Sequence, residues 1–472
     1  MLITTTRKFS SAARSRQATD NTSWSCYSFC VFLALLAVSA IPDKTEAAEA
    51  DYLSYESATQ DSVLKLKDII GRGLKTTVEK VRRAGGRVPE DLPPFLRDSS
   101  LVLSPRLYYF NRERDQTNDS QAAALGGALA YRSGEWRETV SIGATLFTTQ
   151  QLYAPSDEPG SGLLSQDEDG FTVLGEAFVD LRTPDETHFR LFRQSINLPY
   201  VNKNDIRMIP NTFEALQIFN VDDPNFNWVA GHVTKIKQLD SDDFVYMSEA
   251  AGAPGSNDGT SMIGARYNFS NNADIGAINH YSWNVFNTFY AEANGAWDIG
   301  NDTAVRLSAQ FTDLRTVGDE LIGSFETQNF GIRAAASYKG AVFTFAYSHT
   351  DDEAGIQNPF GGYPGYISLI VRDFDRAGED AWLLGASYDF KHIGLPGLSG
   401  FVNYASGDTP DSGIAASPDE TELNFTLDFR PNGGFFDGFW LRARAAFVDE
   451  KGTGSNDLED YRLILNYSIP LL

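Results

Sequence analysis

Residues 440–447 read Trp440-Leu441-Arg442-Ala443-Arg444-Ala445-Ala446-Phe447, and this alternation near the end of the chain decides the fold. Side chains of a strand point alternately to opposite faces, so the apolar residues share one face and the arginines the other. Residues 461–469 repeat the pattern, with aromatic residues bracketing the aliphatic ones. An apolar outer face with aromatic borders and a polar inner face is typical of a strand in a transmembrane β-barrel.

Composition is compatible with that interpretation. The 472 residues, with 32 Phe and 20 Tyr, are enough for one large unit or for two or three ordinary domains. The body of the chain contains no run of about 18 apolar residues, which excludes a transmembrane helix there. The mean hydropathy of -0.28 does not exclude a barrel, whose strands need only every second residue apolar. The net charge of -24 argues against a nucleic-acid binder.

Residues 1–48 are predicted to be a signal peptide that directs export to the periplasm. A basic beginning that includes Arg7 and Arg16 precedes the short apolar run 30–38, and small residues lead to cleavage near Ala48 or Ala50. Both cysteines lie in this segment, so the mature chain would form no disulfide.

Residues 49–98 are predicted to be an N-terminal periplasmic extension. Apolar residues recur at helical spacing over 61–83, and glycines and prolines follow them. The alternatives are a plug for the barrel or a basic amphipathic helix lying on the membrane surface.

Residues 99–472 are predicted to form an all-β transmembrane antiparallel barrel of about 18 strands. Short connections alternate with long ones, which is typical of periplasmic turns and outer loops, and an even strand count returns the chain to its starting side. Residues 366–371 are assigned to a long loop, because a further strand would break this rhythm. The predicted strands are 101–110, 122–132, 136–147, 171–181, 188–193, 213–219, 226–235, 261–269, 274–282, 286–297, 303–314, 328–338, 341–349, 381–390, 400–405, 422–430, 439–449 and 461–469.

The same two-residue period places arginines in the lumen. An arginine on the lipid side near the membrane midplane would cost about 2–4 kcal/mol, so the inward assignment is favoured. Acidic residues gather instead in the outer loops, as in 167–169 and 351–353. A barrel of this size is too wide for its own side chains to fill. Two infolded loops are therefore expected to narrow it: 194–212, with Lys203, Asp205 and Arg207, and 361–378, with Arg372 and Asp373.

Several stretches resemble the OprD-type outer-membrane porins. The most extended is 361–398, GGYPGYISLIVRDFDRAGEDAWLLGASYDFKHIGLPGL, with its D-F segment, G-E-x-x-W and G-x-P-G-L turn. Residues 106–112, 193–194, 204–214 and 461–467 are similar as well, so the resemblance runs from about Pro94 to the end. It implies an 18-stranded barrel, often monomeric, with an eyelet shaped by 194–212 and 350–380. It also implies a ladder of lumen arginines and lysines that guides carboxylate-bearing solutes such as amino acids and organic acids.

The resemblance carries the basic ladder onto particular residues of this chain. Arg442, Arg444 and Arg462 match best, followed by Arg106, Arg193, Arg207 and Arg333. The alternative is that these arginines pair with lumen acids such as Asp428, Glu422 or Asp449 and brace the wall. The chain departs from the family in ending with Leu471-Leu472 rather than an aromatic residue, and in its long helical segment before the first strand.

The predicted function is passive, selective diffusion of small polar solutes across the outer membrane of a Gram-negative bacterium. Predicted partners are small-molecule solutes, outer-membrane lipid and lipopolysaccharide, and the barrel assembly machinery, with a monomer or a trimer as the working unit. No enzyme, cofactor or metal is predicted, because the five histidines lack ligand spacing and no G-x-S-x-G occurs. The alternatives are an adhesin or receptor, a plugged transporter of hydrophobic compounds, an outer-membrane phospholipase, and a soluble β-sandwich or propeller.

Overall fold

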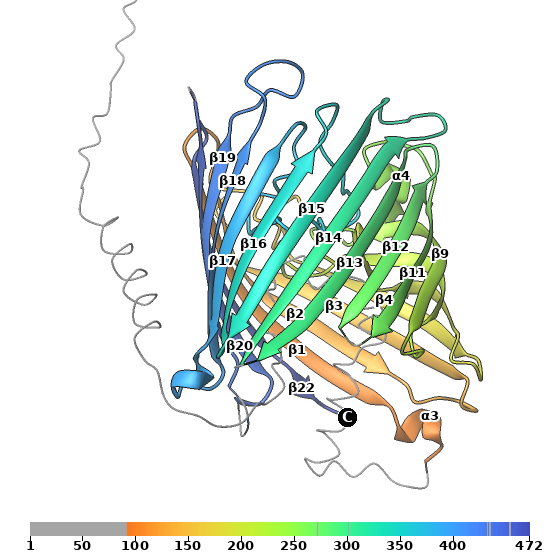
Figure 1. The fold of residues 1–472 in the computed structure, drawn as a ribbon. Coiled ribbons are helices and arrows are strands. Elements are labelled where there is room, and N and C mark those ends of the chain that lie inside the picture. Colours follow the sequence, from red (N-terminus) through yellow and green to blue (C-terminus); the bar gives the residue numbers. More distant parts are fainter. Residues whose placement is uncertain (1–91, 271, 301, 432, 434–435, 453–454) are drawn as a thin grey trace, which may run out of the picture. The chain divides into compact units, whose positions relative to one another are not determined.

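The barrel wall is a single closed antiparallel sheet (Figure 1). The computed structural model describes residues 92–472 except 271, 301, 432, 434, 435, 453 and 454. Eighteen long strands run up and down, each paired with its sequence neighbours, and β1 closes the ring by pairing with β21. The wall strands are β1 (Ser100–Arg114), β2 (Ser120–Arg132), β3 (Val140–Tyr153), β4 (Phe171–Arg182), β5 (His188–Gln194), β8 (Thr212–Asn220), β9 (Phe226–Lys237), β11 (Thr260–Ser270), β12 (Ala273–Ser282), β13 (Phe286–Gly300), β14 (Thr303–Thr316), β15 (Glu326–Tyr338), β16 (Ala341–Thr350), β17 (Asp380–Asp389), β18 (Leu398–Asp408), β19 (Glu420–Phe429), β20 (Phe439–Glu450) and β21 (Leu458–Tyr467).

Shorter elements accompany the wall. The strands β6 (Asn197–Leu198) and β7 (Val201–Asn202) form a small separate hairpin, β10 (Val245–Tyr246) extends the pairing of β9, and β22 (Ile469–Pro470) pairs with β1. The helical pieces are α3 (Pro94–Arg97), α4 (Met247–Ala250) and the 3-10 turn η3 (Phe390–Ile393). Within the described part of the chain, no helix is long and apolar enough to cross a membrane.

The predicted barrel and its eighteen strands are confirmed, with small shifts at their ends. The third strand starts at Val140 rather than Trp136, because Arg137 and Glu138 take left-handed backbone conformations (φ 54° and 59°) in a tight turn. Phe390 leaves the wall to begin η3, and the pairing with β1 passes from β21 to β22 across Ser468. The predicted signal peptide and the helix at 61–83 lie outside the described residues.

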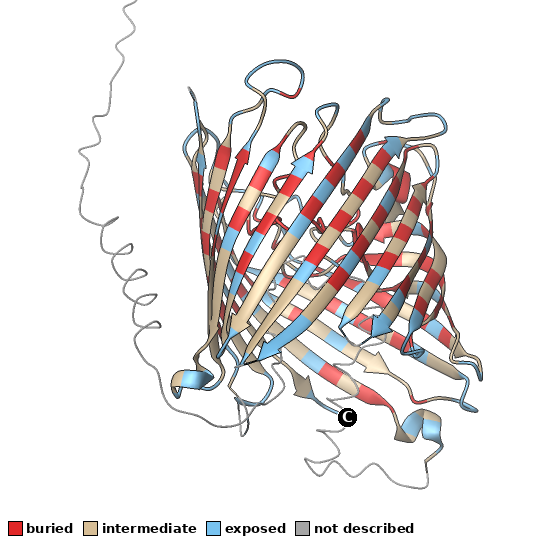
Figure 2. Ribbon diagram, viewed as in Figure 1, coloured by how far each residue is buried: buried red, intermediate tan, exposed pale blue. Residues whose placement is uncertain are grey.

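Burial alternates along the strands as expected for an apolar exterior and a polar interior (Figure 2). In β19, Glu422, Asn424 and Asp428 are buried, whereas Leu427 is 48% exposed. Polar side chains are therefore packed inside the barrel while large aliphatic and aromatic residues cover its outside, the reverse of a soluble protein. This is the arrangement that a lipid surround requires.

Connections at the two ends of the barrel differ in length. One end carries tight turns such as Lys339-Gly340 and residues 183–187, and the other carries 154–170, 195–211, 238–259 and 351–379. The connection 283–285 is a short exception among the long ones. By the general rule for such barrels, the short turns face the periplasm. Residues 366–371 lie in the longest loop, as predicted from the strand rhythm.

Candidate solute pathway

The loop between β5 and β8 folds into the barrel. Ile196, Leu198 and Val201 are buried, and the β6–β7 hairpin positions Tyr200 at its turn, with a left-handed backbone (φ 64°). The Tyr200 hydroxyl lies 2.8 Å from the hydroxyl of Thr312 on β14. Because β14 is several strands away from β5 around the wall, this loop reaches across the lumen.

The long loop 351–379 folds inward from another part of the wall. Ile370, Val371 and Arg372 donate backbone N–H groups to the Glu422 carboxylate of β19, at 3.0, 3.2 and 2.8 Å. The Arg372 guanidinium also pairs with Glu420 and with Glu450, at 2.8 and 2.7 Å. The loop is thus fixed to β19 and β20 by its backbone and by its side chain.

The two infolded loops contact each other. The Asn202 amide donates to the Gly362 carbonyl (2.9 Å) and accepts from the Gly362 N–H (2.8 Å). A side chain at Gly361 would place its Cβ 2.5 Å from Asn202 Oδ1, so only glycine allows this approach. The rings of Tyr200 and Tyr363 meet edge to face, with centroids 6.1 Å apart. Together the loops make one internal partition that narrows the barrel, as the sequence predicted.

Most of the predicted ladder residues have definite acidic partners in the structure. Arg442 binds Asp428 through two hydrogen bonds of 2.8 Å, and both side chains are largely buried. Arg106 holds Asp205 of the first infolded loop with bonds of 2.6 and 3.1 Å. Arg193 pairs with Glu214 at 3.0 Å. The Arg442 and Arg193 pairs join neighbouring wall strands, as in the bracing alternative, whereas the Arg106 pair fixes a loop to the wall.

The three acids proposed to pair with arginines and brace the wall make different contacts. Asp428 does pair with an arginine, but Glu422 accepts the backbone of loop 351–379 instead. Asp449 is exposed, on the same face of β20 as Phe447 and opposite to the buried Arg442 and Arg444. Its position follows from strand parity, because residues separated by two lie on one face.

A second group of arginines surrounds a single carboxylate. Asp460 binds Arg462 (2.6 Å) and Arg112 (2.7 Å), and Arg444 stands directly opposite Arg462 in the β20–β21 register. Arg207 of the first infolded loop approaches the same place. In the described part of the chain, Asp460 is the one carboxylate ion-paired to any of these four guanidinium groups.

We call this group the Arg cluster (Arg112, Arg207, Arg444 and Arg462). Three of its guanidinium groups pack against the ring of Phe110. The guanidinium carbons of Arg112, Arg207 and Arg462 lie 5.5, 4.9 and 5.4 Å from the centre of the Phe110 ring. An aromatic face stabilises a nearby cation by its quadrupole, which allows like charges to gather. Sequence reasoning named three members of the cluster, but Arg112 was not among the predicted ladder residues.

The bonds of Arg207 and Arg444 are to uncharged groups. Arg207 donates to the carbonyls of Ser161 (2.9 Å) and Ile206 (3.1 Å). Arg444 Nε donates to the Thr426 hydroxyl (3.1 Å), and its Nη2 is buried with no hydrogen-bond acceptor among the described residues. Neither guanidinium group has a carboxylate partner, so the Arg cluster together with Asp460 carries more positive than negative charge.

The remaining predicted pathway residues lie on or against the infolded loops. The Arg333 guanidinium lies 4.5 Å from the ring centre of Tyr366, in the long loop. Lys203 is exposed on the first loop, three residues beyond the tip of its hairpin. Arg372, Asp373, Glu420 and Glu450 line a pocket between the long loop and the upper ends of β19 and β20. These residues therefore have different surroundings and do not share one site.

A serine and a histidine do meet on the wall. His232 Nδ1 lies 3.0 Å from Ser261 Oγ, on the neighbouring strands β9 and β11. The Ser261 oxygen also accepts a hydrogen bond from the indole of Trp283 (3.0 Å), which occupies a lone pair that nucleophilic attack would use. Among the described residues, no carboxylate is hydrogen-bonded to the His232 ring to orient it as a base.

A closed antiparallel barrel with an apolar outside, a polar lumen and two infolded loops is an outer-membrane channel of the porin class. The chain belongs to the OprD family of outer membrane porins, whose family model matches residues 93–471. Its place is therefore the outer membrane of a Gram-negative bacterium, where this family forms channels for small solutes. The recognition of this family from sequence is confirmed.

Similar proteins support the assignment. Porin D of Pseudomonas aeruginosa is 24% identical over 413 residues, covering 80% of this chain and 92% of that protein. The crystal structure of P. aeruginosa OccK9 (OpdG) matches with a TM-score of 0.73 and 25% identity, over 80% of this chain and all of that one. P. aeruginosa OpdK, solved with vanillate, matches with a TM-score of 0.71 and 22% identity over the same shares. The crystal structure of Acinetobacter baumannii OccAB1 matches with a TM-score of 0.72 and 20% identity, over 81% of this chain and 99% of that one.

Proposed function

We propose that this porin selects small carboxylate-bearing solutes, such as amino acids and organic acids, through the Arg cluster. The observation that carries the proposal is the four guanidinium groups around Asp460, which leave a net positive charge on one side of the lumen. A guanidinium can bind a carboxylate through two parallel hydrogen bonds. Several weak sites in series allow an anion to enter and still to leave.

One relative was solved with a ligand of this chemistry. OpdK was solved with vanillate, which carries a carboxylate. The pathway we propose runs from the pocket at Arg372 and Asp373, past the loop residues Lys203 and Asp205, to the Arg cluster. The other ladder positions, Arg106, Arg193, Arg333 and Arg442, then shape the wall and the local potential.

The experiment compares Arg444→Ala with the wild type in planar bilayers under a salt gradient. Arg444 is the suitable target because removing it leaves no carboxylate without its partner. We expect the anion-to-cation permeability ratio to fall severalfold and liposome uptake of an organic acid to slow, while uptake of a neutral sugar is kept.

Arg315→Ala is the matched control, since Arg315 is half-exposed at the outer end of β14 and pairs with Asp313. It should leave the ratio unchanged. Heat-modifiable migration of both variants in gel electrophoresis would show that they fold. An unaltered ratio in a folded Arg444→Ala channel would contradict the proposal.

We infer further that the barrel is a channel and not an enzyme. The relatives described above are porins, and the His232–Ser261 pair combines an indole donor on the nucleophile with a histidine that no carboxylate orients. A phospholipase assay on the purified barrel should show no Ser261-dependent hydrolysis. Steady single-channel current would separately argue against the adhesin and plugged-transporter alternatives.

We also propose the cellular setting. Residues 1–48 are removed as a signal peptide, residues 49–98 form a periplasmic extension, and residues 99–472 enter lipid and lipopolysaccharide through the barrel assembly machinery. We propose a monomer as the working unit, with a trimer as the alternative, and light scattering of the detergent-solubilised protein distinguishes the two.

A further inference from the structure

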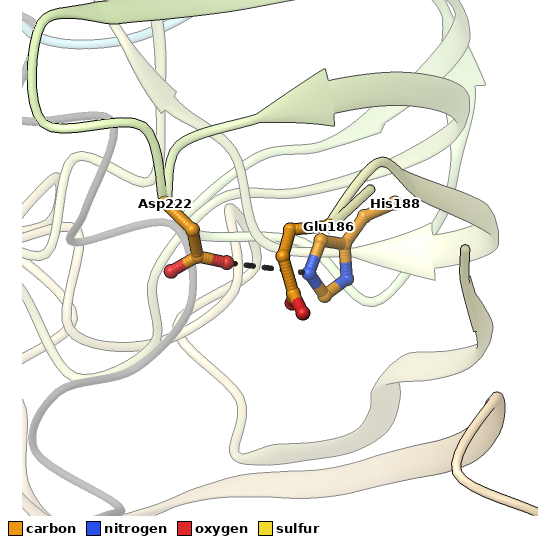
Figure 3. Close-up of side chains that lie close together, drawn as sticks. All are labelled: Glu186, His188 and Asp222. Atoms are coloured by element: carbon orange, nitrogen blue, oxygen red, sulfur yellow. Dashed lines mark ion pairs between the residues drawn. The ribbon is translucent and has the colours of Figure 1, made fainter. Parts of the chain in front are cut away.

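Three side chains of types that can ligate a metal lie close together in and beside two of the short turns (Figure 3). Glu186 belongs to the β4–β5 turn, His188 is the first residue of β5, and Asp222 belongs to the β8–β9 turn. One potential ligand atom from each lies within 4.8 Å of the others. The two turns are held together independently, because Asn220 donates to the Asp185 carbonyl at 2.9 Å.

The histidine of this cluster is fixed in place. His188 is 8% exposed, and its ring stacks parallel to Phe219 with centroids 5.1 Å apart. Its Nδ1 lies 2.7 Å from Asp180 Oδ1. Packing on one face and a hydrogen bond at one edge leave the imidazole a single orientation.

The neighbouring charges also fix which nitrogen carries the proton. Arg190 binds the Asp180 carboxylate through two nitrogens, at 2.8 and 2.6 Å, so this carboxylate is ionised and only accepts hydrogen bonds. His188 Nδ1 must then be the donor. In the neutral imidazole the lone pair is therefore on Nε2, which is buried with no hydrogen-bond partner among the described residues.

This unpartnered nitrogen points toward the carboxylates. His188 Nε2 is 4.0 Å from Asp222 Oδ2, the contact drawn as a dashed line in Figure 3. A carboxylate that orients a histidine, whose far nitrogen faces further carboxylates, is the arrangement found around protein-bound zinc. The buried nitrogen without a partner is the feature that a simple network of hydrogen bonds would not leave.

We propose that Glu186, His188 and Asp222 bind a divalent transition metal of the zinc type at this end of the barrel. Zinc takes nitrogen and carboxylate ligands at about 2.0–2.2 Å in tetrahedral geometry, which requires the ligand atoms to be roughly 3.4 Å apart. The Asp222 and Glu186 side chains are 51% and 42% exposed and can close that distance by rotating. Water would take the fourth position.

The charges around the site accommodate the ion. Arg182 pairs with Glu186 at 3.2 Å and with Glu135 at 3.3 Å, so it retains an acidic partner when Glu186 turns to the metal. Asp180 remains bound to Arg190 and does not need to move. The metal would join the two turns and stiffen the rim of the channel there.

The test uses the mature protein, which lacks the two cysteines of the signal peptide, refolded in detergent without a histidine tag and stripped with a chelator. We expect one equivalent of Zn²⁺ in calorimetric titration and, with Co²⁺ as the probe, a tetrahedral absorption band that Zn²⁺ removes. Asp222→Asn changes an exposed residue and should fold normally, yet it should weaken Zn²⁺ binding by at least about tenfold. His188→Gln should abolish the cobalt band.

His349→Gln is the matched control, because His349 also has its Nδ1 near an aspartate (Asp380, 3.0 Å) but is half-exposed and belongs to no such cluster of the described residues. It should bind zinc like the wild type. Absence of stoichiometric Zn²⁺ binding, equal binding by Asp222→Asn, or binding of Ca²⁺ and Mg²⁺ alone would overturn the proposal. Channel selectivity plays no part in these measurements, so they are independent of the proposed solute.

Discussion

At the scale of single residues, Glu422 controls the position of a whole loop. Its carboxylate accepts three consecutive backbone N–H groups, from Ile370 to Arg372. Glu422→Gln replaces an oxygen acceptor by an amide donor that faces these N–H groups, at a cost of about 1–3 kcal/mol. We expect the loop to detach more often, measured as more frequent current interruptions in single-channel recordings and faster proteolysis within 351–379.

The control for Glu422→Gln is a substitution within loop 351–379 itself. Glu353→Gln removes the same charge from an exposed position, so it should leave both readouts at the wild-type level. Equal behaviour of the two variants would show that Glu422 acts only through its charge.

The sequence could predict that Glu422 points inward but not what it binds. Strand parity is a local property, set by the two-residue period, and it assigned Glu422 and Asp428 to the lumen correctly. The choice between pairing with an arginine and holding a loop depends on where residues 50 positions away are placed. That information lies in tertiary packing, which alternation does not encode.

At the scale of elements, loop 351–379 contains a group of acids whose ionisation opposes its docking. Burial, together with the charges of Asp373 and Glu379, raises the pKa of Asp375 well above its usual value. Because the pKa of Asp375 is higher in the docked loop, the loop takes up protons when it docks. Docking is therefore stronger at low pH and becomes weaker as the pH rises through that pKa.

We therefore expect wild-type channels to show fewer current interruptions at about pH 5 than at neutral pH. An aspartate with an unperturbed pKa would stay ionised over this whole interval and would give no such difference. Asp375→Asn channels should show few current interruptions at both pH values, because the asparagine side chain cannot ionise. Single-channel recording across that range checks the prediction. A pH response of unchanged size in Asp375→Asn would assign it to other groups.

Sequence reasoning could not predict the paths that the two infolded loops take through the barrel. It identified 194–212 and 361–378 as infolded from the width of the barrel and from their composition. The contacts that set their paths join Tyr200 to Thr312 and Asn202 to Gly362, across 112 and 160 positions. Sequence reasoning missed the cluster of Glu186, His188 and Asp222 for a related reason, since the barrel brings together a residue of β5 and residues of two turns.

At the scale of the whole molecule, closure of the ring depends on the pairing of β1 with β21 and β22. Thirteen backbone positions of β1 pair with β2 on one side, and its other side is covered by the last strands from Arg106↔Asn466 to Arg114↔Leu458. All the strands of this ring lie within residues 100–470. The barrel is thus complete without the residues before 92.

This completeness makes the role of the N-terminal segment testable. A chain that retains the signal peptide but lacks residues 51–91 should form a heat-modifiable barrel with wild-type conductance, because every strand and both infolded loops remain. If the segment is instead a plug, its removal should raise the conductance and shorten closures. A chain that ends at residue 457 is the opposite case, because it lacks β21 and leaves β1 and β20 with unpaired edges in lipid. Each unsatisfied backbone group there costs several kcal/mol, so this chain should not fold.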